Sequence, residues 1–232
     1  MDWQANLAPE LQAKIAAVDT QIAPRLQALD EQIINNQAKV LEAFQAENIS
    51  ESHLNGTTGY GNDDQGRDKL EAVYSHVFKT EDALVRPQLV SGTHAIGTAL
   101  LGMLRPGDDL LYLTGEPYDT LQEVIGMAGN GIGSLKEFQI GFDFVPLLAD
   151  GAVDFETART KITAKTKVVA IQRSRGYADR DSFTVDKIKE MIAFVKNINP
   201  ELIVFVDKAY GELSETTAPT EFGADVMAGW LI

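Results

Sequence analysis

From residue 83 to residue 228, short apolar runs that are typical of β-strands alternate with apolar residues at helical spacing. Neighbouring parallel strands need a long crossover, and a helix is the usual one. We therefore expect an α/β protein with a mostly parallel sheet and helices on both faces. The predicted strands are 83–90, 109–113, 142–147, 167–171, 202–206 and 225–228, and the predicted helices are 93–104, 119–128, 155–164 and 185–197.

A helical arm is predicted ahead of this domain, over residues 1–54. Apolar residues recur every three or four positions from residue 8 to residue 47, as they do on one face of a helix. Pro24 is expected to divide the pattern into two helices, because proline removes a backbone donor and clashes with the preceding turn. The apolar face suits packing on the chain's own domain as well as packing on a neighbouring subunit.

Residues 55–82 are predicted to hold a glycine-rich loop and a connecting helix, and the main domain then covers 83–232. Repeated glycines in the polar stretch 55–66 indicate a loop. A helix is expected to begin at Arg67 and Asp68. The loop is either a flexible linker or a fixed segment that brings Tyr60 and Arg67 to an anion.

Composition argues against several classes of protein and site. A formal net charge of −14 makes nucleic acid or an anionic membrane surface an unexpected partner. The chain has no cysteine and has three histidines at unrelated spacings, so no metal site is predicted. No apolar run approaches the roughly 20 residues of a membrane span. The N-terminus does not have the features of a signal peptide, and a cytoplasmic protein is expected.

The last residues, 224–232, form a strand-like apolar run that stops abruptly. Chain termini usually lie at the surface of a domain. We therefore expect the sequence to be broken off inside a domain, with its C-terminal part missing.

Polar residues follow the predicted strands at the edge where parallel α/β sheets bind ligands. The first strand leads into Ser91, Gly92 and Thr93, at the start of a helix whose free N–H groups can bind an anion. The later strands are followed by Tyr118 and Asp119, by the group Gln172, Arg173, Ser174 and Arg175, and by Asp207. An anion-binding turn, an aromatic ring, a basic cluster and a carboxylate are thus expected on one rim.

Asp207 closes the apolar run 202–206, which predicts a buried central strand. A carboxylate is costly there unless it has a charged or hydrogen-bonding partner. It either caps a turn or binds a metal, or it pairs with the protonated ring nitrogen of a cofactor.

Other rim residues leave similar alternatives. Tyr118 either packs in the core or stacks on a flat ligand. Arg173 and Arg175 are either solvated charges paired with nearby aspartates or a site for phosphate or carboxylate. His94, beside the turn, is either packed and hydrogen-bonded or lies against a ring.

Several blocks of the sequence together resemble one family, over nearly the whole chain. It is the pyridoxal-phosphate-dependent family of methionine gamma-lyase-like or aluminium-resistance proteins, which is related to the cystathionine lyases and belongs to fold type I of the aspartate aminotransferase superfamily. The blocks are SGTHA (91–95), GEPYDT (115–120), IQRSRGY (171–177), VD (206–207) with YGE (210–212), the glycine-rich stretch 59–68, and 219–229.

The resemblance implies pyridoxal 5'-phosphate as cofactor. Gly92 and Thr93 would hold its phosphate, in the turn that begins at Ser91. Tyr118 or His94 would stack on the pyridine ring, and Asp207 would pair with the ring nitrogen. The resemblance places further residues near the other face of the cofactor or its hydroxyl, namely Gln172, Arg173 and Ser174, and near its phosphate, namely Tyr60 and Arg67, which come from the adjacent subunit in related lyases. It also implies the large domain of fold type I and a homo-oligomer, either a dimer or a tetramer.

The implied activity is a carbon–sulfur lyase reaction, a β- or γ-elimination on a sulfur-containing amino acid. An aminotransferase and a decayed, non-catalytic cofactor-binding or interaction module remain alternatives. The family's Schiff-base lysine is expected just after Ile232 and is not present, so we expect the chain to be inactive alone. Trp230 stands where the family usually has a small hydroxyl residue.

Lys208 also departs from the family, which usually has an uncharged polar residue after the aspartate. It is not expected to replace the missing lysine, because adjacent side chains on a strand point to opposite faces.

Overall fold

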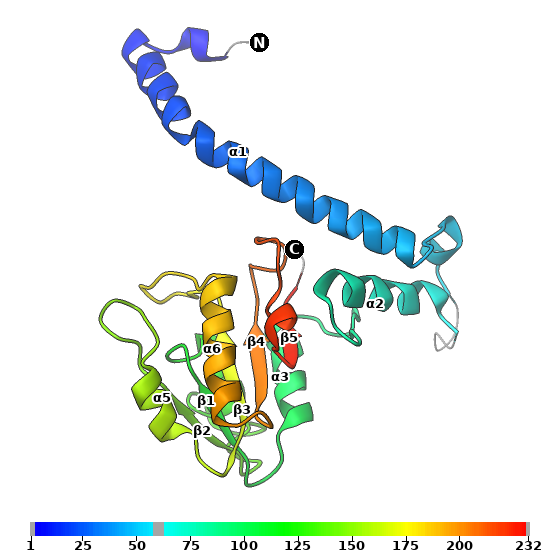
Figure 1. Ribbon diagram of the computed structural model, residues 1–232, viewed down its shortest axis with the longest axis vertical. Coiled ribbons are helices and arrows are strands. Elements are labelled where there is room, and N and C mark those ends of the chain that lie inside the picture. The colour runs from blue at the N-terminus through cyan, green and yellow to red at the C-terminus, as the bar shows by residue number, and fades with distance from the viewer. Residues whose placement is uncertain (1–2, 58–62, 231–232) are drawn as a thin grey trace.

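The computed structural model describes residues 3–57 and 63–230. Within them, a sheet lies between two layers of helices, and a long helix extends away from this body (Figure 1). The strands pair in parallel in the order β2-β1-β3-β4-β5. Their bounds are β1 Asp109–Tyr112, β2 Gly141–Phe144, β3 Thr166–Gln172, β4 Ile203–Asp207 and β5 Val226–Ala228. The predicted parallel α/β fold is confirmed.

Helices cover both faces of the sheet. Helices α3 (Gly92–Met103) and α4 (Asp119–Ile125) lie on one face, and α5 (Phe155–Lys161) and α6 (Val185–Ile198) lie on the other. Successive strand residues point to opposite faces. Phe205 therefore packs in the α3 and α4 layer, whereas Val204 and Val206 pack against α6. Burial on both sides explains why β3 and β4 are apolar runs rather than alternating ones.

Local signals set several helix boundaries. Ser91 caps α3, because its side-chain oxygen accepts a hydrogen bond from the His94 N–H at 3.1 Å. Gly126 ends α4 in the left-handed conformation, with φ of 93°, which is three residues earlier than the predicted end at Gly129. Short 3-10 helices cover Trp3–Asn6, Glu51–Leu54 and Pro219–Phe222.

The predicted strand 83–90 is wrong. These residues form a loop outside the sheet, with a turn in which the Leu89 N–H bonds to the Arg86 carbonyl at 3.1 Å. Pro87 cannot donate to a strand ladder, and the Val85 N–H bonds instead to the Glu71 carboxylate at 2.9 Å. Val90 is 79% exposed, so this apolar run does not contribute a core strand.

The predicted division of the arm at Pro24 is also wrong. Helix α1 runs without a break over Pro9–Ala46, with Pro24 inside it. A proline removes one helical hydrogen bond and can bend a helix without ending it. The helix curves in its N-terminal half (Figure 1), where its residues are mostly exposed and no packing opposes a bend.

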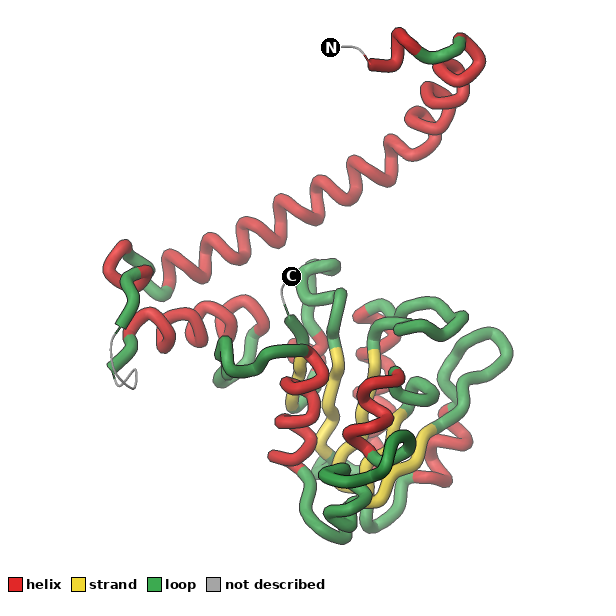
Figure 2. The backbone as a smooth tube through the Cα atoms, turned by 180° about the vertical axis from the view of Figure 1, so that it is seen from behind, coloured by secondary structure: helices red, strands yellow, loops and turns green. Residues whose placement is uncertain are grey.

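The second half of α1 packs on the rest of the chain. Ala43 is buried with Val73 and Val77 of α2 (Gln65–Phe78). The side-chain nitrogen of Asn36 donates to the Leu213 carbonyl at 2.6 Å. The first half stands clear of the body (Figure 2). None of the helices in the described parts of the chain is long and apolar enough to cross a membrane.

Candidate functional site

Four of the predicted site residues meet where β3 and β4 end and α3 begins. The Thr93 hydroxyl lies 3.0 Å from the Tyr118 hydroxyl. The backbone N–H of Tyr118 donates to Oε1 of Gln172 at 3.1 Å. Gln172 and Asp207 are paired across β3 and β4. Residues 93, 118, 172 and 207 thus form one cluster, which we call the rim cluster.

Tyr118 is held at its hydroxyl and at its backbone. Its hydroxyl contacts Thr93, which also lies 3.1 Å from the Thr120 hydroxyl, and its backbone is held by Gln172. Burial raises the pKa of the Tyr118 hydroxyl, and the charge of Asp207 raises it further. The ring is therefore neutral and pre-positioned, as a stacking platform requires.

Asp207 is the buried ionisable group of the rim cluster. Its side chain is 2% exposed, and its Oδ1 accepts a hydrogen bond from the Ala209 N–H at 3.0 Å. Burial raises the pKa of this carboxyl from 3.8 to about 6. The ionised form is held at a cost, so a cation or a strong donor beside it is favoured.

Tyr112, which no sequence pattern indicated, lies at the end of β1 in the same layer. It is fully buried, and its hydroxyl has no hydrogen-bond partner among the described residues. Burial raises the pKa of Tyr112 well above its ordinary value, and the charge of Asp207 adds to this. The Tyr112 hydroxyl is thus a buried polar group in the same layer as the rim cluster whose hydrogen-bonding capacity is not used by the described residues.

Trp230 covers the start of α3. Its side chain packs directly on Gly92, where a Cβ would overlap the indole ring. The backbone N–H of Trp230 donates to Oε1 of Glu212 at 2.7 Å. Its ring meets that of Tyr210 edge-on, with 5.3 Å between the ring centroids. The anion-binding turn predicted at Gly92 is thus covered by a side chain of the same chain.

The remaining residues of the turn are placed as follows. Ser91 caps α3, as described above, and His94 is exposed, with its Nδ1 accepting a hydrogen bond from the Val90 N–H at 3.4 Å. Tyr118, rather than His94, is the ring that contacts Thr93.

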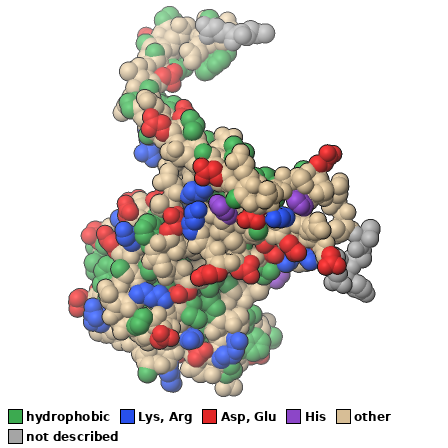
Figure 3. All heavy atoms as spheres, turned by 45° about the vertical axis from the view of Figure 1, so that its right-hand side comes forward, with side chains coloured by type: hydrophobic (Ala, Val, Ile, Leu, Met, Phe, Trp, Pro, Cys, Tyr) green, Lys and Arg blue, Asp and Glu red, His purple; other side chains and the backbone are tan. Residues whose placement is uncertain are grey.

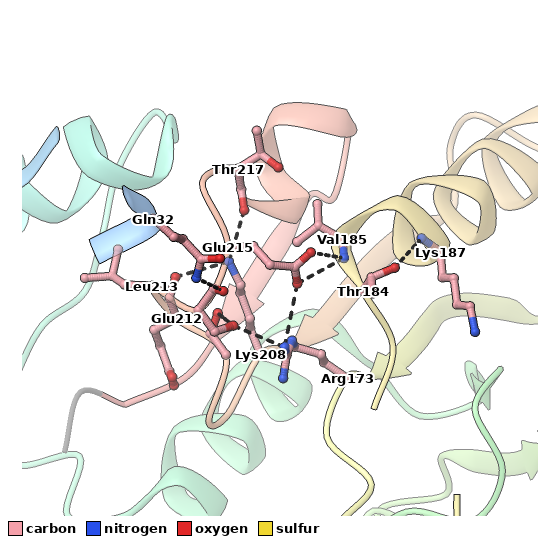
Figure 4. Close-up of polar contacts among 12 residues, drawn as sticks. Gln32, Arg173, Thr184, Val185, Lys187, Lys208, Glu212, Leu213, Glu215 and Thr217 are labelled. Atoms are coloured by element: carbon pink, nitrogen blue, oxygen red, sulfur yellow. Dashed lines mark hydrogen bonds and ion pairs between the residues drawn. The ribbon is translucent and has the colours of Figure 1, made fainter. Parts of the chain in front are cut away.

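Arg173 lies apart from the rim cluster. Its guanidinium donates to the Ser214 hydroxyl at 3.1 Å and lies 3.6 Å from a carboxylate oxygen of Glu215 (Figure 4). Glu215, and not one of the aspartates near residue 180, is its charged partner. Because Gln172 and Arg173 are neighbours at a strand end, their side chains leave toward opposite faces. The role of Arg173 at a cofactor stays a prediction.

Arg180 is a residue that the sequence analysis missed. Its guanidinium donates to the carbonyls of Gln172 and Ser174, at 3.3 and 2.5 Å. The Ser174 carbonyl also accepts a hydrogen bond from the Gln172 amide at 3.1 Å. Arg180 therefore holds the segment that positions Gln172. In the sequence, the only sign of this role is a single charged residue within a polar loop. Arg175 is exposed.

Lys208 points away from Asp207, as expected from strand alternation. It is 1% exposed, and its Nζ donates to the carbonyls of Glu212 and Thr217 at 3.2 and 3.4 Å (Figure 4). Nζ also lies 5.9 Å from the centre of the Phe78 ring. Burial lowers the pKa of Lys208 to about 8. Its amine faces the arm and not the rim cluster.

Arg67 lies in the first turn of α2, at the end of that helix remote from the sheet (Figures 1 and 2). Its backbone N–H donates to the capping Asp64 carboxylate at 3.1 Å. Tyr60 lies outside the described residues. A contribution of either residue to a phosphate site, from an adjacent subunit, stays a prediction. Residues 3–57 and 63–230 contain no group of three or more His, Cys, Asp or Glu that could hold a metal ion.

Comparisons with known proteins place this geometry in context. A family model described as methionine gamma-lyase matches residues 11–232. An uncharacterised protein of Bacillus subtilis, YnbB, is 52% identical over 226 residues, which are 97% of this chain and 52% of that protein.

Two solved structures from Listeria are also similar. They are described as candidate cystathionine beta-lyases involved in aluminium resistance. The one from L. monocytogenes is 60% identical, with a TM-score of 0.92, and the match covers 94% of this chain and 55% of that one. The one from L. innocua is 60% identical, with a TM-score of 0.94, and the match covers 96% and 54%. The chain thus spans about half the length of these relatives.

Proposed function

Since the chain belongs to the methionine gamma-lyase family, we propose that its protein is a pyridoxal-phosphate-dependent carbon–sulfur lyase acting on a sulfur-containing amino acid. The observation that carries the proposal is the buried carboxylate of Asp207 within the rim cluster. The names of the Listeria relatives support a lyase. The activity is proposed for the whole protein.

The residues at the ring end fit the cofactor. A buried carboxylate whose pKa is raised to about 6 is stabilised by a cation beside it. A protonated pyridine nitrogen is such a cation, and the bound cofactor supplies an electron sink for charge that develops on the substrate. Asp207 would hold the proton on that nitrogen.

Tyr118 and Gln172 would orient the ring. The Tyr118 ring is fixed by contacts at its hydroxyl and at its backbone, so little conformational entropy is lost when a flat ligand stacks on it. Gln172 is in turn held by Thr114, whose hydroxyl accepts the Gln172 N–H at 2.9 Å. Thr93, Tyr118 and Gln172 are therefore held in place before a ligand arrives, as the residues of preorganised sites are.

The residues at the start of α3 do not leave room for the phosphate of the cofactor. The first turn of α3 offers its N–H groups and the Thr93 hydroxyl, which are suitable for a phosphate. The Trp230 ring lies over Gly92 at this point. A phosphate reaches Gly92 only after the ring has moved.

The test of the cofactor proposal is the variant Asp207→Asn. Asparagine keeps the size of the side chain and the acceptor for the Ala209 N–H, but it has no charge to hold a protonated nitrogen. We expect pyridoxal 5'-phosphate to bind about tenfold or more weakly in equilibrium dialysis, since a charged hydrogen bond is worth about 1.5–3 kcal/mol. Asp119→Asn changes an exposed carboxylate at the same edge of the sheet and is the matched control. Equal affinities of the Asp207→Asn variant and the unchanged chain would contradict the proposal.

The reaction itself is tested with the whole protein. L-cystathionine and L-methionine are incubated with the protein and cofactor, and free thiol is measured alongside 2-oxo acid. Elimination releases a thiol, whereas the alternative, transamination, yields a 2-oxo acid without one. Thiol release supports the lyase, and a 2-oxo acid without thiol supports an aminotransferase.

We also propose that the protein is a homo-oligomer assembled through α1. Its first half exposes large apolar side chains (Figure 3), and these recur at helical spacing, including Leu11, Val18, Ile22 and Leu26. An apolar stripe on a helix that leaves its own domain is typical of a surface that packs against another chain.

A further inference from the structure

The contact between Trp230 and Gly92 closes the anion-binding turn. Gly92 is buried although it is the first residue of α3, and its cover is the indole ring. With that ring in place, the side of Gly92 that would carry a Cβ does not face solvent. A glycine at this point allows the close approach, since any other side chain would overlap the ring.

Trp230 is held by the loop that follows β4. The Glu212 carboxylate accepts the backbone N–H of Trp230 at 2.7 Å, and Tyr210 meets the indole ring edge-on. Tyr210 itself adopts a left-handed backbone with φ of 64°, a conformation that non-glycine residues rarely adopt. Glu212 therefore fixes the backbone of Trp230 and Tyr210 packs on its ring, so one short loop positions the indole at the start of α3.

We propose that Trp230 is a gate of the phosphate subsite, which admits a phosphate group only when the indole leaves Gly92. The proposal rests on the proposed function, because it assigns the turn at Gly92 and Thr93 to the phosphate of the cofactor. The ring end of the site does not depend on the gate, since Asp207, Tyr118 and Gln172 are held by contacts that do not involve Trp230. The gate therefore discriminates between ligands by their phosphate.

The test compares three ligands on three forms of the chain. The ligands are pyridoxal 5'-phosphate, pyridoxal without phosphate, and inorganic phosphate. The forms are the unchanged chain, Trp230→Ser, which removes the ring, and Trp230→Phe, which keeps an aromatic cover. We expect Trp230→Ser to bind both phosphate-bearing ligands about tenfold or more tightly than the unchanged chain, and to bind pyridoxal with the same affinity. Trp230→Phe should remain close to the unchanged chain. Equal binding of phosphate-bearing ligands to Trp230→Ser and the unchanged chain overturns the gate.

A second measurement leaves Trp230 in place. The chain has two tryptophans, so Trp3→Phe makes Trp230 the single fluorescent indole. Inorganic phosphate should increase acrylamide quenching of Trp230 as the ring moves into solvent, and pyridoxal should not. Quenching that does not change at saturating phosphate overturns the proposal, even where Trp230→Ser fails to fold.

The two proposals fail in different ways. Tighter phosphate binding by Trp230→Ser, together with no effect of Asp207→Asn, supports the gate and contradicts the cofactor role of Asp207. Weaker cofactor binding by Asp207→Asn, together with no gain in Trp230→Ser, supports the cofactor role and overturns the gate.

Discussion

The buried carboxylate of Asp207 should destabilise the folded chain at neutral pH. Its pKa is raised by burial from 3.8 to about 6, so the folded state binds a proton more tightly than the unfolded state. Stability therefore falls as the pH rises from about 4 to about 6 and stays low above that range. At about 1.4 kcal/mol per pKa unit, the cost at pH 7 is about 3 kcal/mol.

The variant Asp207→Asn removes this cost while it keeps the shape of the side chain. We expect its free energy of unfolding at pH 7 to exceed that of the unchanged chain by about 2–3 kcal/mol. The difference should shrink to near zero at pH 4, where the carboxyl is protonated in both states. Urea unfolding curves at pH 4, 5, 6, 7 and 8 measure it directly.

Asp119→Asn provides the control and should show no such pH-dependent difference. A gain for Asp207→Asn that is the same at pH 4 and pH 7 would refute the reasoning, because the gain would then not come from the charge. A loss of stability at pH 7 would also refute it. The expected combination, a more stable chain that binds the cofactor less well, is the trade-off of a site that is strained for function.

Because the pKa of Lys208 is lowered to about 8, the free energy of unfolding should rise as the pH goes from about 8 to about 10.5. Lys208→Met should abolish this rise in urea unfolding, and a rise that persists in the variant would come from another group. Thr93→Val removes the hydroxyl contact with Tyr118 and should cost about 1 kcal/mol of stability and weaken cofactor binding several-fold, whereas an unchanged affinity would show that Tyr118 is fixed by other contacts. Leu26→Glu places a charge on the exposed apolar face of α1 and should reduce self-association, measured by sedimentation velocity. Gln27→Glu is the control. Equal sedimentation of both variants and the unchanged chain would show that α1 is not part of an interface.

The sequence predicted the sheet well where strands are buried on both faces. The strands β1, β3 and β4 are continuous apolar runs, and their pattern has no competing interpretation once helices alternate with them. The segment 83–90 has a similar composition but is not a strand. Pro87 excludes an inner strand but allows an edge strand. Composition alone therefore left both states open, and the lack of a pairing partner decides between them.

The site was predicted to the extent that strand ends determine it. Asp207 and Gln172 follow from their places after β4 and β3, and Lys208 follows from alternation. The same alternation separates Arg173 from Gln172, although both follow β3 in the sequence and were predicted to lie at one site. The unsatisfied hydroxyl of Tyr112 and the cover of Gly92 by Trp230 depend on packing between distant segments, which no local pattern encodes.

The loop 208–218 joins two regions of the chain that are otherwise separate. At one end, Glu212 holds Trp230 over Gly92. At the other, the carbonyls of Leu213 and Thr216 accept hydrogen bonds from Asn36 and Lys39 of α1. This loop is therefore the physical route by which a displacement of the arm would reach the residue that covers the turn. A comparison of phosphate affinity at low and high protein concentration would show whether assembly through the arm acts on the turn by this route.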